Sequence, residues 1–172
     1  MGRNIELKAR FPDLAAAREA AKRLGATFAG ALDQRDTYFA TTSGRLKLRE
    51  ISGRGAELIA YARDDAAAVR GSDYQIIPMP NPDGLRAALA STLGVRIVVA
   101  KRRELWTWQG VRIHLDDVAG LGRFVEFEAV MADGEPDEVG HAKVRTLRKA
   151  LGIADADLVG VSYSDLLLAA IA

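Results

Sequence analysis

The residues of this sequence best suited to chemistry are three carboxylates in one stretch, Val111 to Val130. Apolar and polar residues alternate on both sides of a glycine-containing turn, which is the pattern of a β-hairpin. Asp116, Glu126 and Glu128 all fall on the polar side of this hairpin. Because acidic residues are poor strand formers, two interpretations are open. Either the polar side faces water, or it lines a polar cavity in which carboxylates bind a divalent cation.

Basic residues recur in the same way on other predicted strands, with apolar residues on the opposite side. These basic residues are Lys8, Lys47, Arg49, Arg63, Lys101 and Arg103, and Glu6 adds a carboxylate two residues before Lys8. Arginine and lysine are the residues that bind phosphate oxygens. A cavity lined by these bases and acids would bind a polyanion together with a cation that neutralises it. The alternative remains a solvated sheet face with interspersed charges.

The hairpin and the basic strands belong to a chain that alternates short strands with helices. Strands are predicted at 3–11, 34–40, 45–51, 56–63, 72–79 and 96–108, followed by the two strands of the hairpin. Helices are predicted at about 14–24, 81–93 and 136–151, and a last helix begins at Ser162, where Asp165 completes a capping box. Eight strands are about the number at which a barrel can hold a ligand. The predicted fold is therefore α+β, an eight-stranded antiparallel β-barrel with helices packed outside.

Composition limits the classes of protein to which this chain can belong. A length of 172 residues predicts one domain, spanning 1–172. The absence of cysteine excludes disulfides, thiolate metal sites and thiol nucleophiles. The charged start of the chain is not a secretory signal, and no apolar run is long enough to span a membrane, so a cytoplasmic protein is expected. A net charge of +1 predicts no general attraction to nucleic acid or to membranes.

Seven short motifs in this chain resemble those of the CYTH superfamily, the triphosphate tunnel enzymes. The N-terminal E-x-E-x-K signature is matched at residues 4–8, except that Asn4 replaces the first glutamate. The acidic hairpin signature is matched from Leu115 to Glu128. The remaining matches are Asp36 to Phe39, Lys47 to Arg49, Arg63 in place of a usual lysine, Lys101 to Arg103, and Ser162 to Leu167. The resemblance covers nearly the whole chain, from Arg3 to Leu168.

The resemblance implies an eight-stranded tunnel and a substrate that carries a triphosphate. It assigns phosphate binding to the six basic residues listed above and binding of Mg²⁺ or Mn²⁺ to Glu6, Asp116, Glu126 and Glu128. Among these, Glu6, Lys8, Arg103 and Glu126 are the expected catalytic residues. The partner is then a small molecule such as ATP, thiamine triphosphate or tripolyphosphate. We expect a monomer or a homodimer that binds neither nucleic acid nor membrane.

The type of reaction stays open at this point. The motifs look most like the class IV adenylyl cyclase-like branch, which converts ATP to cyclic AMP and pyrophosphate. The alternative is a triphosphatase, and a further alternative is a non-catalytic module that binds polyphosphate or a nucleotide. Asn4 favours the last alternative, because it removes one expected metal ligand. His114 shares the side of Asp116, and we interpret it as a structural histidine hydrogen-bonded to a neighbour.

Overall fold

The computed structural model describes residues 3–61 and 74–172, which form one eight-stranded antiparallel sheet and four α-helices. The spatial order of the strands is β1-β8-β7-β6-β2-β3-β4-β5. The strands are β1 (Arg3–Arg10), β2 (Thr27–Phe39), β3 (Arg45–Ile51), β4 (Gly55–Tyr61), β5 (Tyr74–Met79), β6 (Val95–Trp108), β7 (Val111–Val118) and β8 (Gly122–Met131). The helices are α1 (Leu14–Arg23), α2 (Pro82–Leu93), α3 (Asp137–Leu151) and α4 (Tyr163–Ile171), with a short 3₁₀ helix, η1 (Asp155–Asp157).

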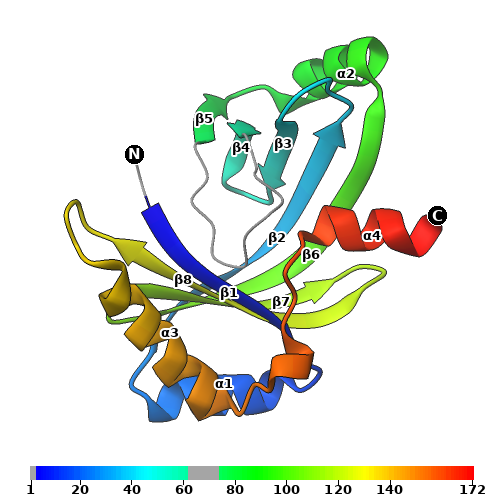
Figure 1. Ribbon diagram of the computed structural model, residues 1–172. Coiled ribbons are helices and arrows are strands. Elements are labelled where there is room, and N and C mark those ends of the chain that lie inside the picture. Colours follow the sequence, from blue (N-terminus) through cyan, green and yellow to red (C-terminus); the bar gives the residue numbers. More distant parts are fainter. Residues whose placement is uncertain (1–2, 62–73) are drawn as a thin grey trace.

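Two long strands, β2 and β6, connect the two parts of a strongly bent sheet (Figure 1). They have 13 and 14 residues and pair with each other along most of their length. One part of the sheet continues through β7 and β8 to β1, and the other through β3 and β4 to β5. The bend therefore brings strands from both ends of the sheet around a common inner side.

The outer side of β1, β7 and β8 is covered by α1 and α3 (Figure 1). Successive side chains of a strand point to opposite faces, so the alternating apolar residues of these strands all meet the two helices. The strand residues of this core include Ile5, Ala9, Val111, Ile113, Leu115, Val125, Phe127, Ala129 and Met131, and the helices contribute residues such as Ala17, Val144 and Leu147. The burial of this face provides the main apolar core of the molecule.

A close contact of α3 with the sheet depends on Gly140. A β-carbon at this position would lie 2.6 Å from the sulfur of Met131 and 2.7 Å from Cγ1 of Ile5. These distances are far below an ordinary van der Waals contact. Glycine therefore allows α3 to pack directly on β1 and β8.

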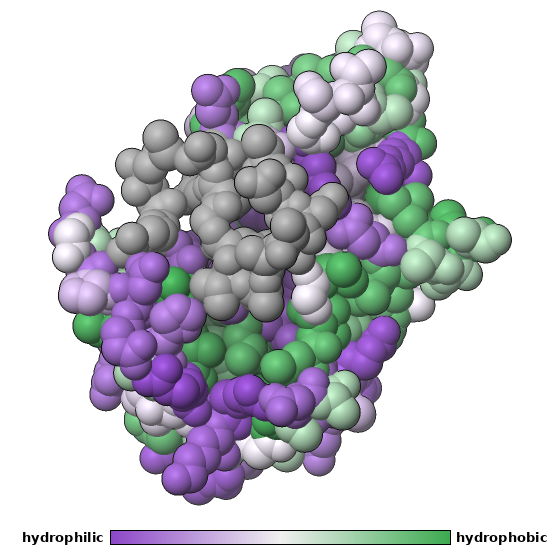
Figure 2. Space-filling view, in the orientation of Figure 1, coloured by the Kyte–Doolittle hydropathy of each residue, from purple (hydrophilic) through white to green (hydrophobic). Residues whose placement is uncertain are grey.

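Smaller apolar clusters hold α2 and α4 in place. Phe39 and Leu48 pack against Leu85 and Leu89 of α2. Tyr163, at the start of α4, packs with buried residues of β6, β7 and β8 on the inner side of the sheet. Figure 2 shows hydrophilic residues over α1 and α3 at the lower left and hydrophobic residues on α4 at the right.

Most predicted elements are confirmed, and the main difference concerns β2. The sequence predicted a strand at 34–40, whereas β2 begins at Thr27. Gly30 has a φ of 139° at a register shift between β2 and β6, and this β-bulge interrupts the alternation on which the prediction relied. Because of this bulge, the part of β2 before residue 34 could not be predicted from alternation.

The predicted closure of the sheet into a barrel is not confirmed. Within residues 3–61 and 74–172, β1 and β5 are the two edges, and no hydrogen-bonded ladder joins them. The predicted ends of two strands, 62–63 and 72–73, and with them Arg63, lie outside the described residues. No helix in the described part of the chain is long and apolar enough to cross a membrane.

Candidate active site

The inner side of the sheet, which we call the charged face, collects the predicted site residues. It is the side opposite α1 and α3, and its charged groups come from six strands. They are Glu6 and Lys8 of β1, Asp36 of β2, Lys47 and Arg49 of β3, Lys101 and Arg103 of β6, Asp116 of β7, and Glu126 and Glu128 of β8. All the predicted site residues that the structure describes therefore share one face. Asp36 belongs to a predicted motif, but its sequence position gave it no role in the site.

Asp36 organises the basic residues of β3. Its carboxylate accepts hydrogen bonds from Nζ of Lys47 at 2.8 Å and from Nε of Arg49 at 3.1 Å. Burial alone would raise the pKa of Asp36, but the charges of Lys47 and Arg49 outweigh burial and hold it well below its usual range. Asp36 is therefore an anion that fixes two cations at neighbouring positions.

Asp116 has the same relationship to the basic residues of β6. Arg103 donates two hydrogen bonds of 2.6 Å to its carboxylate, and Nζ of Lys101 lies 3.5 Å away. Burial opposes ionisation of Asp116, yet Arg103 and Lys101 lower its pKa to about 2. Asp116 has no exposed surface. The Tyr163 hydroxyl also donates a hydrogen bond of 2.8 Å to Oδ2 of Asp116. Both carboxylate oxygens of Asp116 therefore accept hydrogen bonds from protein donors.

Lys101 differs from Arg49 and Arg103 in the direction in which its pKa is shifted. It is buried, and burial together with repulsion by Arg103 lowers the pKa of Lys101 to about 8. A buried ammonium group whose charge is only partly balanced by its neighbours is stabilised when an anion binds beside it. This position therefore suits a negatively charged ligand.

The acidic residues gather on β1 and β8, beside these bases. Glu6 lies directly across from Glu128, and Lys8 directly across from Glu126. Like charges opposite each other in a sheet are destabilising. Desolvation by the surrounding groups, and to a smaller extent repulsion from Glu126 and Glu128, raises the pKa of Glu6 to about 7, although Glu6 is an exposed residue.

Glu126 is the residue that joins the acids to the bases. Nη2 of Arg103 donates to it at 2.8 Å, and Nζ of Lys8 lies 3.6 Å away. Burial would raise the pKa of Glu126, but Lys8 and the other nearby cations hold it well below its usual range. Glu126 is therefore an anion at the point where the acidic and the basic regions of the charged face meet.

His114 completes the acidic region. One ligand atom from each of His114, Glu126 and Glu128 fits within a span of 4.8 Å, the kind of group that can hold a metal ion. The sequence interpretation of a histidine hydrogen-bonded to a neighbour does not hold for Nδ1, which is buried and has no hydrogen-bond partner among the described residues. Strand alternation placed His114 on the side of Asp116. Only the register between β7 and β8, however, shows that it lies opposite Glu126.

A C-terminal segment, residues 158–165, runs across the charged face from β1 to β3. The backbone N–H of Val159 donates to the carbonyl of Lys8 at 2.9 Å, so the segment starts on the edge strand β1. Ser162 and Asp165 form the predicted capping box of α4. Arg45 of β3 donates to the side chains of both.

Tyr163 lies at the centre of this segment and contacts several charged groups. Its ring is 4.5 Å from Nζ of Lys8 and 4.9 Å from Nζ of Lys101, which are cation–π distances. Its hydroxyl binds Asp116. Tyr163 was part of the C-terminal motif, but nothing in the sequence indicated that it orients bases located on other strands.

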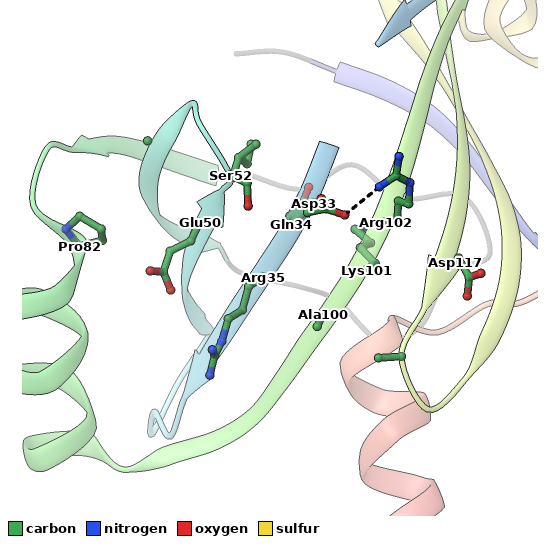
Figure 3. A pocket seen from close by; sticks show the side chains of 13 residues that line it. Asp33, Gln34, Arg35, Glu50, Ser52, Pro82, Ala100, Lys101, Arg102 and Asp117 are labelled. Carbon is green, nitrogen blue, oxygen red and sulfur yellow. Dashed lines mark ion pairs between the residues drawn. The ribbon is translucent and has the colours of Figure 1, made fainter. Parts of the chain in front are cut away.

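A groove lies mainly on the opposite side of the sheet (Figure 3). Its volume is about 730 Å³, and its lining includes Asp33, Arg35, Arg102 and Asp117. Figure 3 shows Asp33 and Arg102 forming an ion pair, with a separation of 3.6 Å. These residues alternate along their strands with those of the charged face. The groove is therefore largely a different surface with mixed charges, although it shares Lys101 with the predicted site.

The sheet of this protein presents adjoining acidic and basic regions on one inner face. Comparison with known protein families identifies the family to which the chain belongs. The profile of the CYTH domain matches residues 2–163, so the chain belongs to the CYTH family. Members of this family are adenylate cyclase-like or triphosphatase enzymes that act on triphosphate substrates and use divalent metals.

Individual relatives agree with this assignment. The putative adenylate cyclase MJ0240 of Methanocaldococcus jannaschii is 26% identical over 172 residues, which cover 94% of this chain and 97% of that protein. The structure of the PH1012 protein of Pyrococcus horikoshii OT3 has a TM-score of 0.82 at 23% identity, covering 95% of this chain and 98% of that one. The putative adenylyl cyclase HpAC1 of Hippeastrum, described as having a dominant triphosphatase activity, has a TM-score of 0.70 at 17% identity, covering 97% and 96%.

Proposed function

We propose that this protein is a metal-dependent enzyme that acts on the triphosphate of a small molecule bound on the charged face. The observation that carries the proposal is the direct contact between the acidic and basic regions at Glu126, which pairs with both Arg103 and Lys8. A triphosphate lying across this junction would meet phosphate-binding groups and metal-binding groups at the same time.

The basic region would bind the phosphate oxygens. Arg103 and Arg49 offer planar pairs of donors that match phosphate geometry, while Lys8, Lys47 and Lys101 offer point charges. Arg63, which lies outside the described residues, keeps its expected role as a further phosphate ligand. Asp36 and Asp116 would not contact the substrate. They hold their basic partners in place, so that the donors are oriented before the substrate arrives, which is the preorganisation that stabilises developing charge.

The acidic region fits the divalent cation that the family uses. Glu6, Glu126 and Glu128 are the proposed oxygen ligands. Glu128 already pairs with Arg112 through Oε2 at 2.9 Å, and a bound cation would in addition relieve the repulsion that Glu126 and Glu128 exert on Glu6. Asp116 was also an expected ligand, but with both oxygens bound to Arg103 and Tyr163 we propose that it positions Arg103 instead. A bound Mg²⁺ or Mn²⁺ would supply charge neutralisation to the phosphate oxygens.

The first candidate reaction is the cyclisation of ATP, in line with the named activity of the relative MJ0240. In that reaction the 3′-hydroxyl of the ribose attacks the α-phosphorus and pyrophosphate leaves. Glu6, Lys8, Arg103 and Glu126 are the residues that we expect to contact the reacting groups or the metal.

The second candidate is hydrolysis of a triphosphate, and the aromatic residues of the charged face favour it. Tyr163 faces Lys8 and Lys101, whereas Tyr38 and Tyr61 both lie near Lys47. Tyr38 and Tyr163 are also buried, so these two rings offer little surface on which a base could stack. A triphosphatase that binds its substrate only through the phosphates does not need an aromatic ring to stack on a base.

Product analysis separates these candidates. Purified protein would be incubated with ATP, thiamine triphosphate or inorganic tripolyphosphate, in the presence of Mg²⁺ or Mn²⁺, and all products would be resolved. Cyclic AMP with pyrophosphate would establish the cyclase. Orthophosphate without a cyclic nucleotide would establish the triphosphatase. Tight triphosphate binding without any product would replace both with a binding module.

A further inference from the structure

We propose that His114 is a direct nitrogen ligand of the cation site, together with Glu126 and Glu128, and that this nitrogen makes the site prefer a first-row transition ion to Mg²⁺. The inference rests on the proposed function, since the ion would serve the same triphosphate site. It concerns which side chains bind the ion and which ion they select.

The burial of His114 is the first argument. Only 5% of the residue is exposed, and Nδ1 has no hydrogen-bond partner among the described residues. A buried polar nitrogen without a partner costs free energy. A ligand at Nδ1 would remove this cost.

Distances give the second argument. Nδ1 of His114 lies 3.7 Å from Oε2 of Glu126 and 3.8 Å from Oε1 of Glu128. These separations are too long for hydrogen bonds. They are, however, typical of two atoms bound to one ion, because bonds of about 2.1 Å place ligand atoms roughly 3 to 4.3 Å apart. Both separations therefore match those of atoms bound to one ion, which at Glu126 would share Oε2 with the hydrogen bond from Arg103.

The third argument comes from the register of the strands. His114 lies directly across from Glu126, and Glu128 lies directly across from Glu6. The nitrogen and the carboxylates thus come from adjacent, fully paired strands whose outer sides pack on α1 and α3. This rigid support fixes the direction of each side chain, as a selective metal site requires.

Ligand chemistry then determines the ion. Mg²⁺ is bound almost entirely through oxygen and keeps several waters. Imidazole nitrogen favours first-row transition ions, and affinity for mixed nitrogen and oxygen sites rises from Mn²⁺ toward Cu²⁺. A site of one imidazole and two carboxylates should therefore bind Mn²⁺ more tightly than Mg²⁺, and the difference should depend on His114.

The experiment measures binding of Mn²⁺ and Mg²⁺ by calorimetry, in the absence and in the presence of inorganic tripolyphosphate. The H114Q variant should lose about tenfold or more in Mn²⁺ affinity but change little in Mg²⁺ affinity. The matched control is H141Q, since His141 on α3 is the second of the two histidines in the chain. The control should bind both ions as the unmodified protein does.

A spectroscopic measurement on the unmodified protein avoids any dependence on how well H114Q folds. Spin-echo spectra of bound Mn²⁺ should show coupling to a directly bonded ¹⁴N, and labelling the histidines with ¹⁵N should change that coupling. The inference is overturned by bound Mn²⁺ without nitrogen coupling, by equal loss of Mn²⁺ and Mg²⁺ affinity in H114Q, or by the absence of Mn²⁺ binding. Nitrogen-coupled Mn²⁺ in a protein that processes no triphosphate would refute the proposed function but keep this inference.

Discussion

The two faces of the strands β1, β7 and β8 are built from alternating residues of the same segments, yet they have opposite properties. The outer face is apolar and is covered by α1 and α3, whereas the inner face carries buried ions that neutralise one another. Apolar burial stabilises a fold directly, but buried ion pairs contribute little net stability because both ions must be desolvated. We infer that the apolar outer face supplies most of the stability of the fold, and that the charged residues of the inner face form a binding site.

The largest expected effect tests the outer face. Phe127 is fully buried against α1 and α3, so Phe127→Ala should lower the free energy of unfolding by about 3 to 5 kcal/mol. Chemical denaturation monitored by circular dichroism measures this loss. The control is Val130→Ala on the same strand, where the side chain is exposed and a change of less than about 1 kcal/mol is expected. Similar losses in both variants would remove the distinction between the faces.

The neighbours of Phe127 on the same strand test the inner face. Replacing Glu126 and Glu128 together with Gln should lower metal-dependent turnover by about 100-fold or more while the protein still folds, and the free energy of unfolding should fall as well, because Arg103 and Lys8 lose the anion that Glu126 provides. Steady-state kinetics and denaturation measure the two quantities. Asp117→Asn is the control, since Asp117 is an exposed carboxylate of the outer side and should leave turnover unchanged. Undiminished turnover in the double variant would remove the site assignment.

Acid should weaken the inner face while leaving the outer face unaffected. Folding lowers the pKa of Asp116 from 3.8 to about 2, so the ionised carboxylate stabilises the folded state. This contribution is fully present above about pH 4 and is lost as the pH falls through about 2. It amounts to about 2 kcal/mol, at 1.36 kcal/mol per unit. Unfolding measured from pH 6 to pH 2 should show this loss, and Asp116→Asn should lack it. Equal pH dependence in both proteins would contradict the prediction.

The smallest expected effect concerns the connection between the charged face and the C-terminal segment. Tyr163→Phe removes the hydrogen bond to Asp116 but keeps the ring beside Lys8 and Lys101. Stability should fall by about 1 kcal/mol, and KM for the triphosphate should rise a few-fold because Arg103 is held less firmly. Tyr163→Leu, which also removes the ring, should raise KM further. Identical KM values in the two variants would show that the ring does not position the lysines.

Local patterns predicted the alternation of the charged and apolar faces, because strand periodicity depends only on neighbouring residues. Glu126 and Glu128 were therefore placed correctly on the side opposite Phe127. Patterns failed where the chain departs from regular geometry, as at Gly30 in β2, or where sequence-distant segments meet. The contact between Tyr163 and Lys8 depends on tertiary packing, and the position of His114 opposite Glu126 depends on register. The number of strands could not determine whether β1 and β5 would pair.

The course of the C-terminal segment has a consequence for the order in which the protein is made. Every strand and both outer helices precede residue 158 in the chain, and synthesis proceeds from the N-terminus at about 5 to 20 residues per second. The sheet can therefore assemble with all its buried ions before Tyr163 and Asp165 reach Lys8, Asp116 and Arg45. A single proteolytic cut just before residue 158 would leave the same strands, but without the residues that span them. Completion of the site therefore comes after formation of the sheet, once residues 158–165 have been synthesised.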